Sequence, residues 1–221
     1  MIALTVSSVL DVEERGLRDD SDYFTFVAAE ERMASVIRPD HKTGECRGRQ
    51  IGQWRVSENT PPINFDMSID RHDILADGTH RFVDYKTGHD TESIARVDML
   101  TDTNTGNDAV YQLCIYARAF ADLQPDFSGT IRPELYRLPD ISRAGNTKGS
   151  YPIFIDKTPV TYTTDPGGQQ PWQAKFRTVF ARVIDEIFDP NVDFYQTGNL
   201  KNCEHCDFLE LCGRVPDETD D

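Results

Sequence analysis

Two aspartates in the segment 69–88 are the residues whose type and spacing best suit chemistry. The stretches on either side of residues 76–78 alternate in polarity, which predicts a β-hairpin with a three-residue loop. Such a loop requires a left-handed residue, and Gly78 adopts that conformation without strain. In the resulting register every opposed pair sums to 154, so Asp70 lies opposite Asp84.

Carboxylates that face each other across two strands need a compensating positive charge. The Cβ atoms of directly opposed residues are about 4.5–5.5 Å apart, and like charges at that spacing destabilise a sheet. A hard divalent cation such as Mg²⁺, held by two carboxylates and water, would remove the repulsion. Lys86 lies on the same face as Asp84, so its ammonium would stand beside the metal and face the anion that the metal polarises. This arrangement predicts phosphodiester hydrolysis.

A helix is predicted over residues 108–123 by the spacing of its apolar residues, which are Val110, Leu113, Ala117 and Phe120. Gln112 and Tyr116 stand four residues apart on a neighbouring face, so their side chains can reach one point. Cys114 lies about 200° around the helix from both residues and is expected in the core.

These residues resemble the active-site signature of the PD-(D/E)XK nuclease superfamily, in the branch that contains RecB-type and AddB-type nuclease domains. The motif of that branch reads approximately Ile-Asp-Arg-x-Asp and then Asp-Tyr-Lys-Thr-Gly, and a downstream helix supplies Gln-x-x-x-Tyr. The resemblance implies a restriction-endonuclease-like core. It also implies a catalytic set made of Asp70, Asp84, Lys86, Gln112 and Tyr116.

The function implied by the resemblance is that of a metal-dependent DNA nuclease. Asp70, Asp84 and the backbone carbonyl of Tyr85 would hold Mg²⁺ or Mn²⁺, and Lys86 would assist catalysis. The implied enzyme is an Mg²⁺-dependent (exo)deoxyribonuclease that acts in double-strand break repair or recombination, with a helicase as partner or fused region. Two other functions stay open: a catalytically decayed DNA-binding or scaffold module of a repair complex, and a zinc-binding interaction protein.

Three of the five cysteines lie close together near the C-terminus. Clustering at this spacing favours metal or cluster ligation over a disulfide framework. In the family that the chain resembles, a triplet spaced like Cys203, Cys206 and Cys212 holds a 4Fe–4S cluster together with one upstream cysteine. Cys46 is the candidate for that fourth ligand, although it does not match the family's position. Zinc bound by the three thiolates and His205 is the alternative.

The N-terminal part of the chain departs from the family pattern. Residues 1–64 contain neither the cluster cysteine nor the His-containing motif at the positions usual in related proteins, and Ser68 replaces a glycine two residues before Asp70. We therefore expect the chain to be a C-terminal piece of a longer nuclease or helicase-nuclease.

Two polar residues of the hairpin have a structural interpretation. Asp73 points to the face opposite Asp70 in a regular strand, so we expect an ion pair with Arg71 or Arg81 rather than metal binding. His72 lies on the Asp70 face, opposite Phe82. It is expected to be packed or exposed, with a supporting role near the metal as the alternative.

Composition predicts one substantial core in a chain of 221 residues, 38% of them hydrophobic. We expect a nuclease-like domain over 1–195, a cluster-binding tail over 196–214 and an acidic disordered terminus over 215–221. The chain has no apolar run long enough to span a bilayer and no signal peptide, which predicts a cytoplasmic protein that does not enter a membrane. A net charge of −15 opposes DNA binding. Many of the acidic residues lie in the acidic terminus, in the segment 90–108 and at the predicted metal site, where a bound cation would offset their charge.

The order of the predicted elements indicates the fold class. We expect a helix over 1–15, strands over 23–37 and 50–56, the hairpin, and then strands over 129–138, 151–155 and 160–163, with a last helix over 172–187. This order predicts an α/β fold with a mixed central β-sheet flanked by helices. Residues 90–108 form a loop too long for a plain connector, so a flexible or substrate-facing role is expected.

Overall fold

The predicted hairpin lies at the centre of the computed structural model, which describes residues 24–38, 42–43, 45–88, 91–102, 107–141, 151–204 and 206–214. Strands β3 (Asp66–Leu75) and β4 (His80–Lys86) pair antiparallel, and every opposed pair sums to 154 as expected. Gly78 has a φ of 82°, and the backbone N–H of Leu75 donates to the carbonyl of Thr79 at 2.9 Å. The turn chemistry therefore fixed the register that the sequence predicts.

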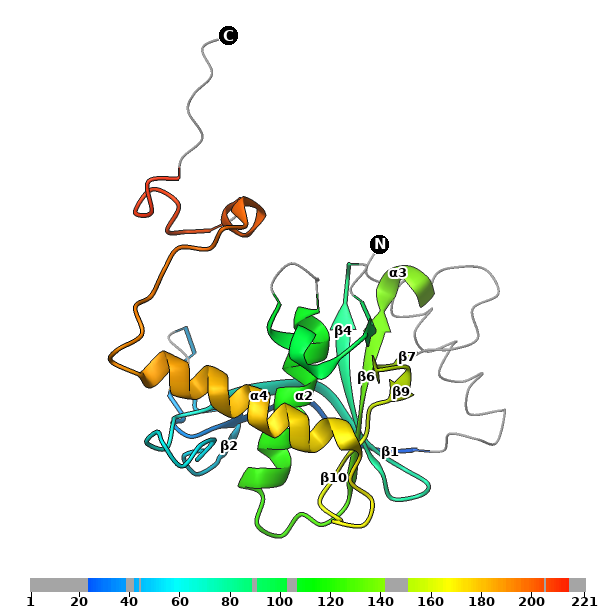
Figure 1. Ribbon diagram of the computed structural model, residues 1–221. Coiled ribbons are helices and arrows are strands. Elements are labelled where there is room, and N and C mark those ends of the chain that lie inside the picture. The colour runs from blue at the N-terminus through cyan, green and yellow to red at the C-terminus, as the bar shows by residue number, and fades with distance from the viewer. Residues whose placement is uncertain are drawn as a thin grey trace. The chain divides into compact units, whose positions relative to one another are not determined.

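Other strands extend the hairpin into a mixed sheet. The strand order is β10-β6-β4-β3-β1-β2, and β7 also pairs with β6. These strands are β1 (Phe24–Ala34), β2 (Arg49–Gln50), β6 (Thr130–Arg137), β7 (Tyr151–Pro152) and β10 (Tyr162–Thr163). β4 and β6 run parallel, as their arrows in Figure 1 show, whereas β3 is antiparallel to both β4 and β1. The predicted α/β fold with a mixed central sheet is confirmed.

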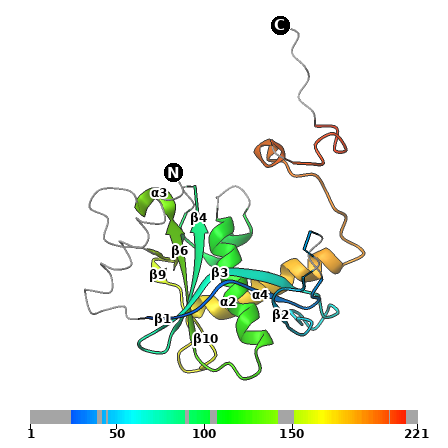
Figure 2. The same cartoon turned by 180° about the vertical axis from the view of Figure 1, so that it is seen from behind.

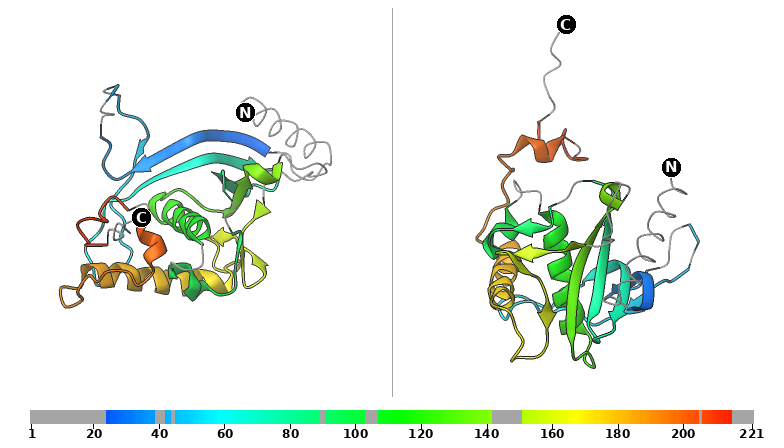
Figure 3. Two further views of the ribbon diagram at one scale, coloured as in Figure 1. Left: turned by 90° about the horizontal axis from the view of Figure 1, so that it is seen from above. Right: turned by 90° about the vertical axis from the view of Figure 1, so that its right-hand side faces the viewer.

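Two long helices cover one face of this sheet. Helix α2 (Asp108–Leu123) has the predicted bounds, and α4 (Pro171–Phe188) matches the last predicted helix within one residue at each end. Figure 3 shows α2 between the sheet and α4. The core joins the three layers: Phe82 of β4 packs against Phe120 of α2, and Tyr111 of α2 contacts Phe176 and Phe180 of α4. The apolar periodicity of both helices thus reflects burial on the sheet side.

Some connecting segments differ from the sequence prediction. The strand predicted over 50–56 is wrong beyond Gln50, because the chain there forms an isolated bridge between Trp54 and Ile63. The expected loop 90–108 contains β5 (Ser93–Ile94) and the 3-10 helix η1 (Val97–Thr101). Both elements bury apolar side chains in the core. This partial order follows from burial that the polar composition of the segment conceals.

The predicted strand over 151–155 is divided in two. β7 ends at Pro152, and β8 (Phe154–Ile155) joins β5 and β9 (Thr158–Pro159) in a separate three-stranded sheet. Proline has no N–H to donate to a ladder, which explains why the first pairing stops there. β10 is shorter than the predicted strand 160–163. The helix expected over 1–15 lies outside the described residues.

The chain divides into two compact units, Met1–Asp185 and Glu186–Asp221. The first contains the sheet. Among the described residues of the second, after the end of α4, a 3-10 helix, η2 (Leu200–Cys203), is followed by a series of turns. Within the described part of the chain, no helix is long and apolar enough to cross a membrane.

Candidate active site

The strands of the hairpin separate beside the two aspartates. The β3–β4 register runs only as far as Arg71 and Val83, while β3 continues alongside β1 to Asp66. Figure 2 shows β1 and β3 side by side. Just beyond the end of the register, the backbone N–H of Tyr85 donates a 2.9 Å hydrogen bond to Oδ2 of Asp70. Asp70 is therefore held against the peptide group that follows Asp84.

Asp84 and Lys86 face the same side of β4, as period-two alternation requires. The Nζ of Lys86 lies 2.8 Å from Oδ2 of Asp84. Asp84 is 6% exposed, while the side chain of Lys86 remains about a quarter exposed. A buried carboxylate thus holds the ammonium of Lys86 in place. The Lys86 side chain still reaches the surface, where it could contact an anion.

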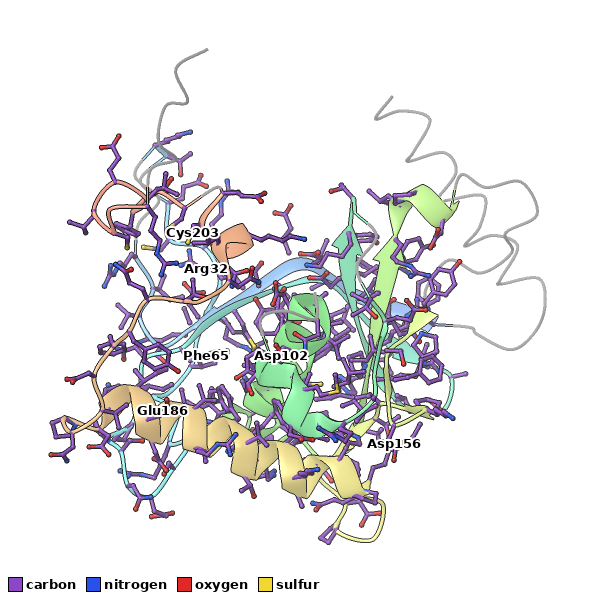
Figure 4. The ribbon with its side chains drawn as sticks, turned by 45° about the horizontal axis from the view of Figure 1, so that its top comes forward. Arg32, Phe65, Asp102, Asp156, Glu186 and Cys203 are labelled. Atoms are coloured by element: carbon purple, nitrogen blue, oxygen red, sulfur yellow. The ribbon has the colours of Figure 1, made fainter. Side chains whose placement is uncertain are left out.

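Helix α2 brings the predicted amide and phenol to this lysine. The Nζ of Lys86 donates to Oε1 of Gln112 at 3.4 Å, and Nε2 of Gln112 donates to the hydroxyl of Tyr116 at 3.0 Å. The four-residue spacing on the helix makes the second contact geometrically available. Phe65, labelled in Figure 4, packs edge-on against Tyr116 with ring centroids 6.5 Å apart. Asp84, Lys86, Gln112 and Tyr116 therefore form one continuous series of contacts.

The donor atoms of this site suit a hard divalent cation. Asp70 and Asp84 supply carboxylate oxygens from two adjacent strands, and carboxylate oxygen is the donor that Mg²⁺ and Mn²⁺ prefer. The catalytic set holds two carboxylates and a single ammonium, so a bound cation would reduce its negative charge. No group of three or more His, Cys, Asp or Glu side chains placed to hold a metal occurs among the residues that the structure describes. Backbone oxygen and water would have to complete the coordination.

Asp73 has the structural role that its strand position predicts. It is fully buried on the opposite face of the sheet, where Nη2 of Arg81 lies 2.6 Å and Nε of Arg71 lies 3.0 Å from its Oδ2. The ring of Phe24 lies below both guanidinium groups. This carboxylate is therefore neutralised by arginine and is unsuited to a metal.

His72 is packed in a hydrogen-bonded series that includes two residues missed by the sequence analysis. Its Nδ1 lies 2.6 Å from Oε2 of Glu31, and its Nε2 lies 2.8 Å from Nδ1 of His80. Burial favours a raised pKa for Glu31, but the hydrogen bond from His72 and nearby positive charge lower that pKa overall. Burial and the neighbouring His72 lower the pKa of His80. Glu31 lies on a different strand, so no local spacing could have linked it to His72.

The cysteine triplet lies in the second unit and is described by itself. Cys203, labelled in Figure 4, and Cys206 are partly buried, and Cys212 is exposed. The backbone N–H of Cys206 donates to the carbonyl of Cys203 at 3.1 Å, and Nη1 of Arg214 lies 3.4 Å from the Sγ of Cys203. His205, the zinc alternative's fourth ligand, lies outside the described residues. The cluster assignment therefore stays a prediction.

The other two cysteines belong to the first unit. Cys46 is exposed, and its proposed role as the fourth cluster ligand stays a prediction. Cys114 of α2 is fully buried in the core, which confirms the expectation from its helical position. Burial raises the pKa of its thiol far above the ordinary value, so this sulfur stays protonated and inert.

Comparison with protein families gives one match. The model of the PD-(D/E)XK nuclease superfamily matches residues 5–213, a range that includes both aspartates, Lys86, helix α2 and the cysteine triplet. A search of curated proteins found no match.

Proposed function

Because the chain belongs to the PD-(D/E)XK nuclease superfamily, we propose that it is a metal-dependent deoxyribonuclease that hydrolyses phosphodiester bonds in DNA. The observation that carries the proposal is the placement of Lys86 between the carboxylate of Asp84 and the amide of Gln112. An ammonium held in this way beside two carboxylates suits a reaction in which negative charge develops on phosphate oxygen.

Each residue of the catalytic set has a distinct role in the proposed reaction. Asp70, Asp84 and the backbone carbonyl of Tyr85 would hold Mg²⁺ or Mn²⁺, which when bound polarises the scissile phosphate and lowers the pKa of a water molecule. Lys86 orients the attacking water or stabilises the negative charge that develops as it adds to phosphorus. Asp84 also fixes the ammonium of Lys86, because the two groups are 2.8 Å apart.

Gln112 and Tyr116 position the DNA strand. The amide of Gln112 hydrogen-bonds to both the ammonium of Lys86 and the hydroxyl of Tyr116, so the three groups are held in fixed positions relative to one another. A DNA strand that contacts Tyr116 would therefore be aligned with Lys86. Alignment of this kind lowers the barrier because the reacting groups no longer need to be brought together in the transition state.

The cleavage assay uses Asp84→Asn and Lys86→Met. Both variants should lose Mg²⁺-dependent DNA cleavage by about 10³-fold or more, because each removes a charge that acts on the reacting phosphate. Asp66→Asn is the matched control, since Asp66 is an exposed acid on β3 that pairs with Arg32. It should leave cleavage unchanged. All three should retain their thermal unfolding midpoints within a few degrees, and unchanged cleavage by Asp84→Asn would contradict the proposal.

The finer proposal concerns the biological setting. The likeness of the motifs to RecB-type and AddB-type domains supports a cytoplasmic exonuclease that acts in DNA break repair or recombination beside a helicase subunit or fused helicase region. Cleavage of 5′-labelled, 3′-labelled and circular DNA would test the exonuclease part. An exonuclease leaves the circle intact, whereas cleavage of the circle would assign an endonuclease.

The same likeness supports a 4Fe–4S cluster on Cys203, Cys206 and Cys212. Protein purified without oxygen should be brown and should contain iron and acid-labile sulfide, and Cys206→Ser should lose both. Cys46→Ser should lose them as well if Cys46 is the fourth ligand. A colourless protein that contains zinc would favour zinc bound with His205, and with it the role of an interaction protein.

A non-catalytic DNA-binding or scaffold module is the second candidate function. The observation in its favour is that the described residues contain no group of three metal-ligating side chains, so the catalytic set has only two carboxylates. This function predicts DNA or partner binding without cleavage in Mg²⁺ or Mn²⁺. It also predicts that Asp84→Asn leaves that binding unchanged.

A further inference from the structure

The parallel pairing of β4 and β6 places a second cation beside the catalytic lysine. Lys86 and Arg137 are paired residues in this ladder, at the ends of strands that stop at the same edge of the sheet (Figure 1). Adjacent strands lie about 4.8 Å apart, and paired residues on parallel strands point to the same face. That face is the one covered by α2, because Leu135, two residues before Arg137, belongs to the core beneath α2.

Two carboxylates and an aromatic ring hold the Arg137 side chain. Its Nη1 lies 2.5 Å from Oε2 of Glu92, and its Nε lies 2.8 Å from Oδ2 of Asp140. Its guanidinium carbon lies 4.8 Å from the ring centroid of Tyr151. Asp140 is nearly buried, whereas the Glu92 side chain is about one-third exposed. Of these two described carboxylates, Asp140 is the fixed one and Glu92 is the one that solvent reaches.

We propose that Arg137 binds a backbone phosphate of the DNA strand next to the scissile phosphate, and that Glu92 occupies this phosphate position when DNA is absent. The proposal rests on the proposed function, because it assumes that DNA enters beside Lys86. Carboxylate and phosphate accept the same pair of N–H donors from a guanidinium, so one can replace the other.

The exchange requires little movement. The carbonyl of Glu92 accepts a 2.7 Å hydrogen bond from the backbone N–H of Phe154, which fixes the main chain of Glu92. The Glu92 side chain alone has to rotate into solvent. Asp140 meanwhile keeps the guanidinium in place, so Arg137 presents a fixed fork to the arriving phosphate. Arg137 is then a substrate-binding residue, and Glu92 competes with the substrate.

The test measures binding of a fluorescent single-stranded 20-mer in Ca²⁺ across a range of KCl concentrations. Arg137→Gln should weaken binding about five- to tenfold and reduce the slope of log K against log salt by about 0.7, the contribution of one phosphate contact on a single strand. Glu92→Gln should tighten binding several-fold, because it removes the competitor. Steady-state cleavage in Mg²⁺ should show these changes in KM, with kcat nearly unchanged.

Two further variants separate binding from structural support. Arg132→Gln is the matched control, because Arg132 lies on the same strand, faces the other side of the sheet and pairs with Glu134. It should leave both affinity and salt slope unchanged. In the double variant, Glu92→Gln should have no effect once Arg137 is glutamine, since the competition no longer exists.

The proposal is overturned if Arg137→Gln keeps the full salt slope, or if Glu92→Gln leaves binding unchanged or weaker. The second criterion decides the matter if Arg137→Gln does not fold. Failure of the proposed function has a different signature: the unaltered protein would not cleave DNA, yet the binding changes at Arg137 and Glu92 would still appear.

Discussion

The two faces of the sheet formed by the β3–β4 hairpin and β6 each carry acidic and basic side chains, but they combine them in different proportions. On the face away from α2, the buried carboxylates pair with arginines. Asp73 pairs with both Arg71 and Arg81, and Glu134 pairs with Arg132. On the face covered by α2, the catalytic set combines Asp70 and Asp84 with one ammonium. The first face is neutralised within the protein, and the second carries an excess of acid.

This difference separates a face that stabilises the fold from the face on which we propose that catalysis takes place. A buried ion pair is tolerated only when each charge is fully paired, which is the condition met around Asp73. Unbalanced carboxylates repel each other across strands. Around Asp70 the strands no longer pair, and the backbone N–H of Tyr85 supplies the hydrogen bond. The repulsion that remains favours the binding of a cation, so acid excess here points to function.

The largest expected effect on stability comes from breaking the neutral face. Asp73→Asn should lower the free energy of unfolding by about 3–5 kcal/mol, because it leaves buried arginine charge unpaired. Asp84→Asn should change that free energy by less than about 1 kcal/mol, because it relieves repulsion as it loses an ion pair with a lysine that is partly exposed. Urea unfolding measures both.

Cleavage should show the reverse pattern. At temperatures below the unfolding transition of the variant, Asp73→Asn should cleave DNA at nearly the normal rate. Asp84→Asn should lose cleavage although it stays folded. A stable but inactive Asp73→Asn protein would break the comparison, because it would place Asp73 in the reaction.

A smaller effect is expected from the amide that extends the catalytic face. Gln112→Ala should lower kcat/KM for DNA cleavage by about 10- to 100-fold, because it removes the bridge between Lys86 and Tyr116 without removing a charge. Gln124→Ala is the matched control: Gln124 caps the other end of α2 and should be neutral. If both variants cleave at the normal rate, the series of contacts ends at Lys86.

The sequence predicted the parts of the site that depend on local spacing. The alternation of the hairpin, its turn glycine and the four-residue helical spacing fix the positions of Asp70, Asp84, Gln112 and Tyr116 within their own elements. The same alternation placed Asp73 on the other face. Each of these inferences needs only the geometry of one element or one tight turn.

The residues that the sequence missed depend on pairing between distant segments. Arg137 lies beside Lys86 only because β6 pairs parallel with β4, and parallel pairing leaves no turn in the sequence to reveal its register. Glu31 meets His72 because β1 pairs antiparallel with β3, although the two residues are 41 positions apart in the sequence. The interpretation of 90–108 as a loop is wrong at β5 and η1, because Ile94, Val97 and Leu100 are buried in the core.

The smallest expected effect sharpens the comparison through pH. The folded pKa of Glu31 is lowered below its ordinary value of 4.5 although burial opposes this, because His72 hydrogen-bonds to its carboxylate. Its stabilising contribution is therefore full above that ordinary pKa and is lost as pH falls through the lowered folded pKa. Glu31→Gln should cost about 1 kcal/mol of unfolding free energy at pH 7.

In urea unfolding from pH 7 down to pH 3, the gap between the unaltered protein and Glu31→Gln should shrink below the ordinary pKa of 4.5 as Glu31 is protonated. Glu45→Gln is the control, because Glu45 is exposed and its ion pair with Arg47 lies at the surface, where such pairs contribute little to stability. A gap that stays constant over this range would show that Glu31 stabilises the α2 face by packing.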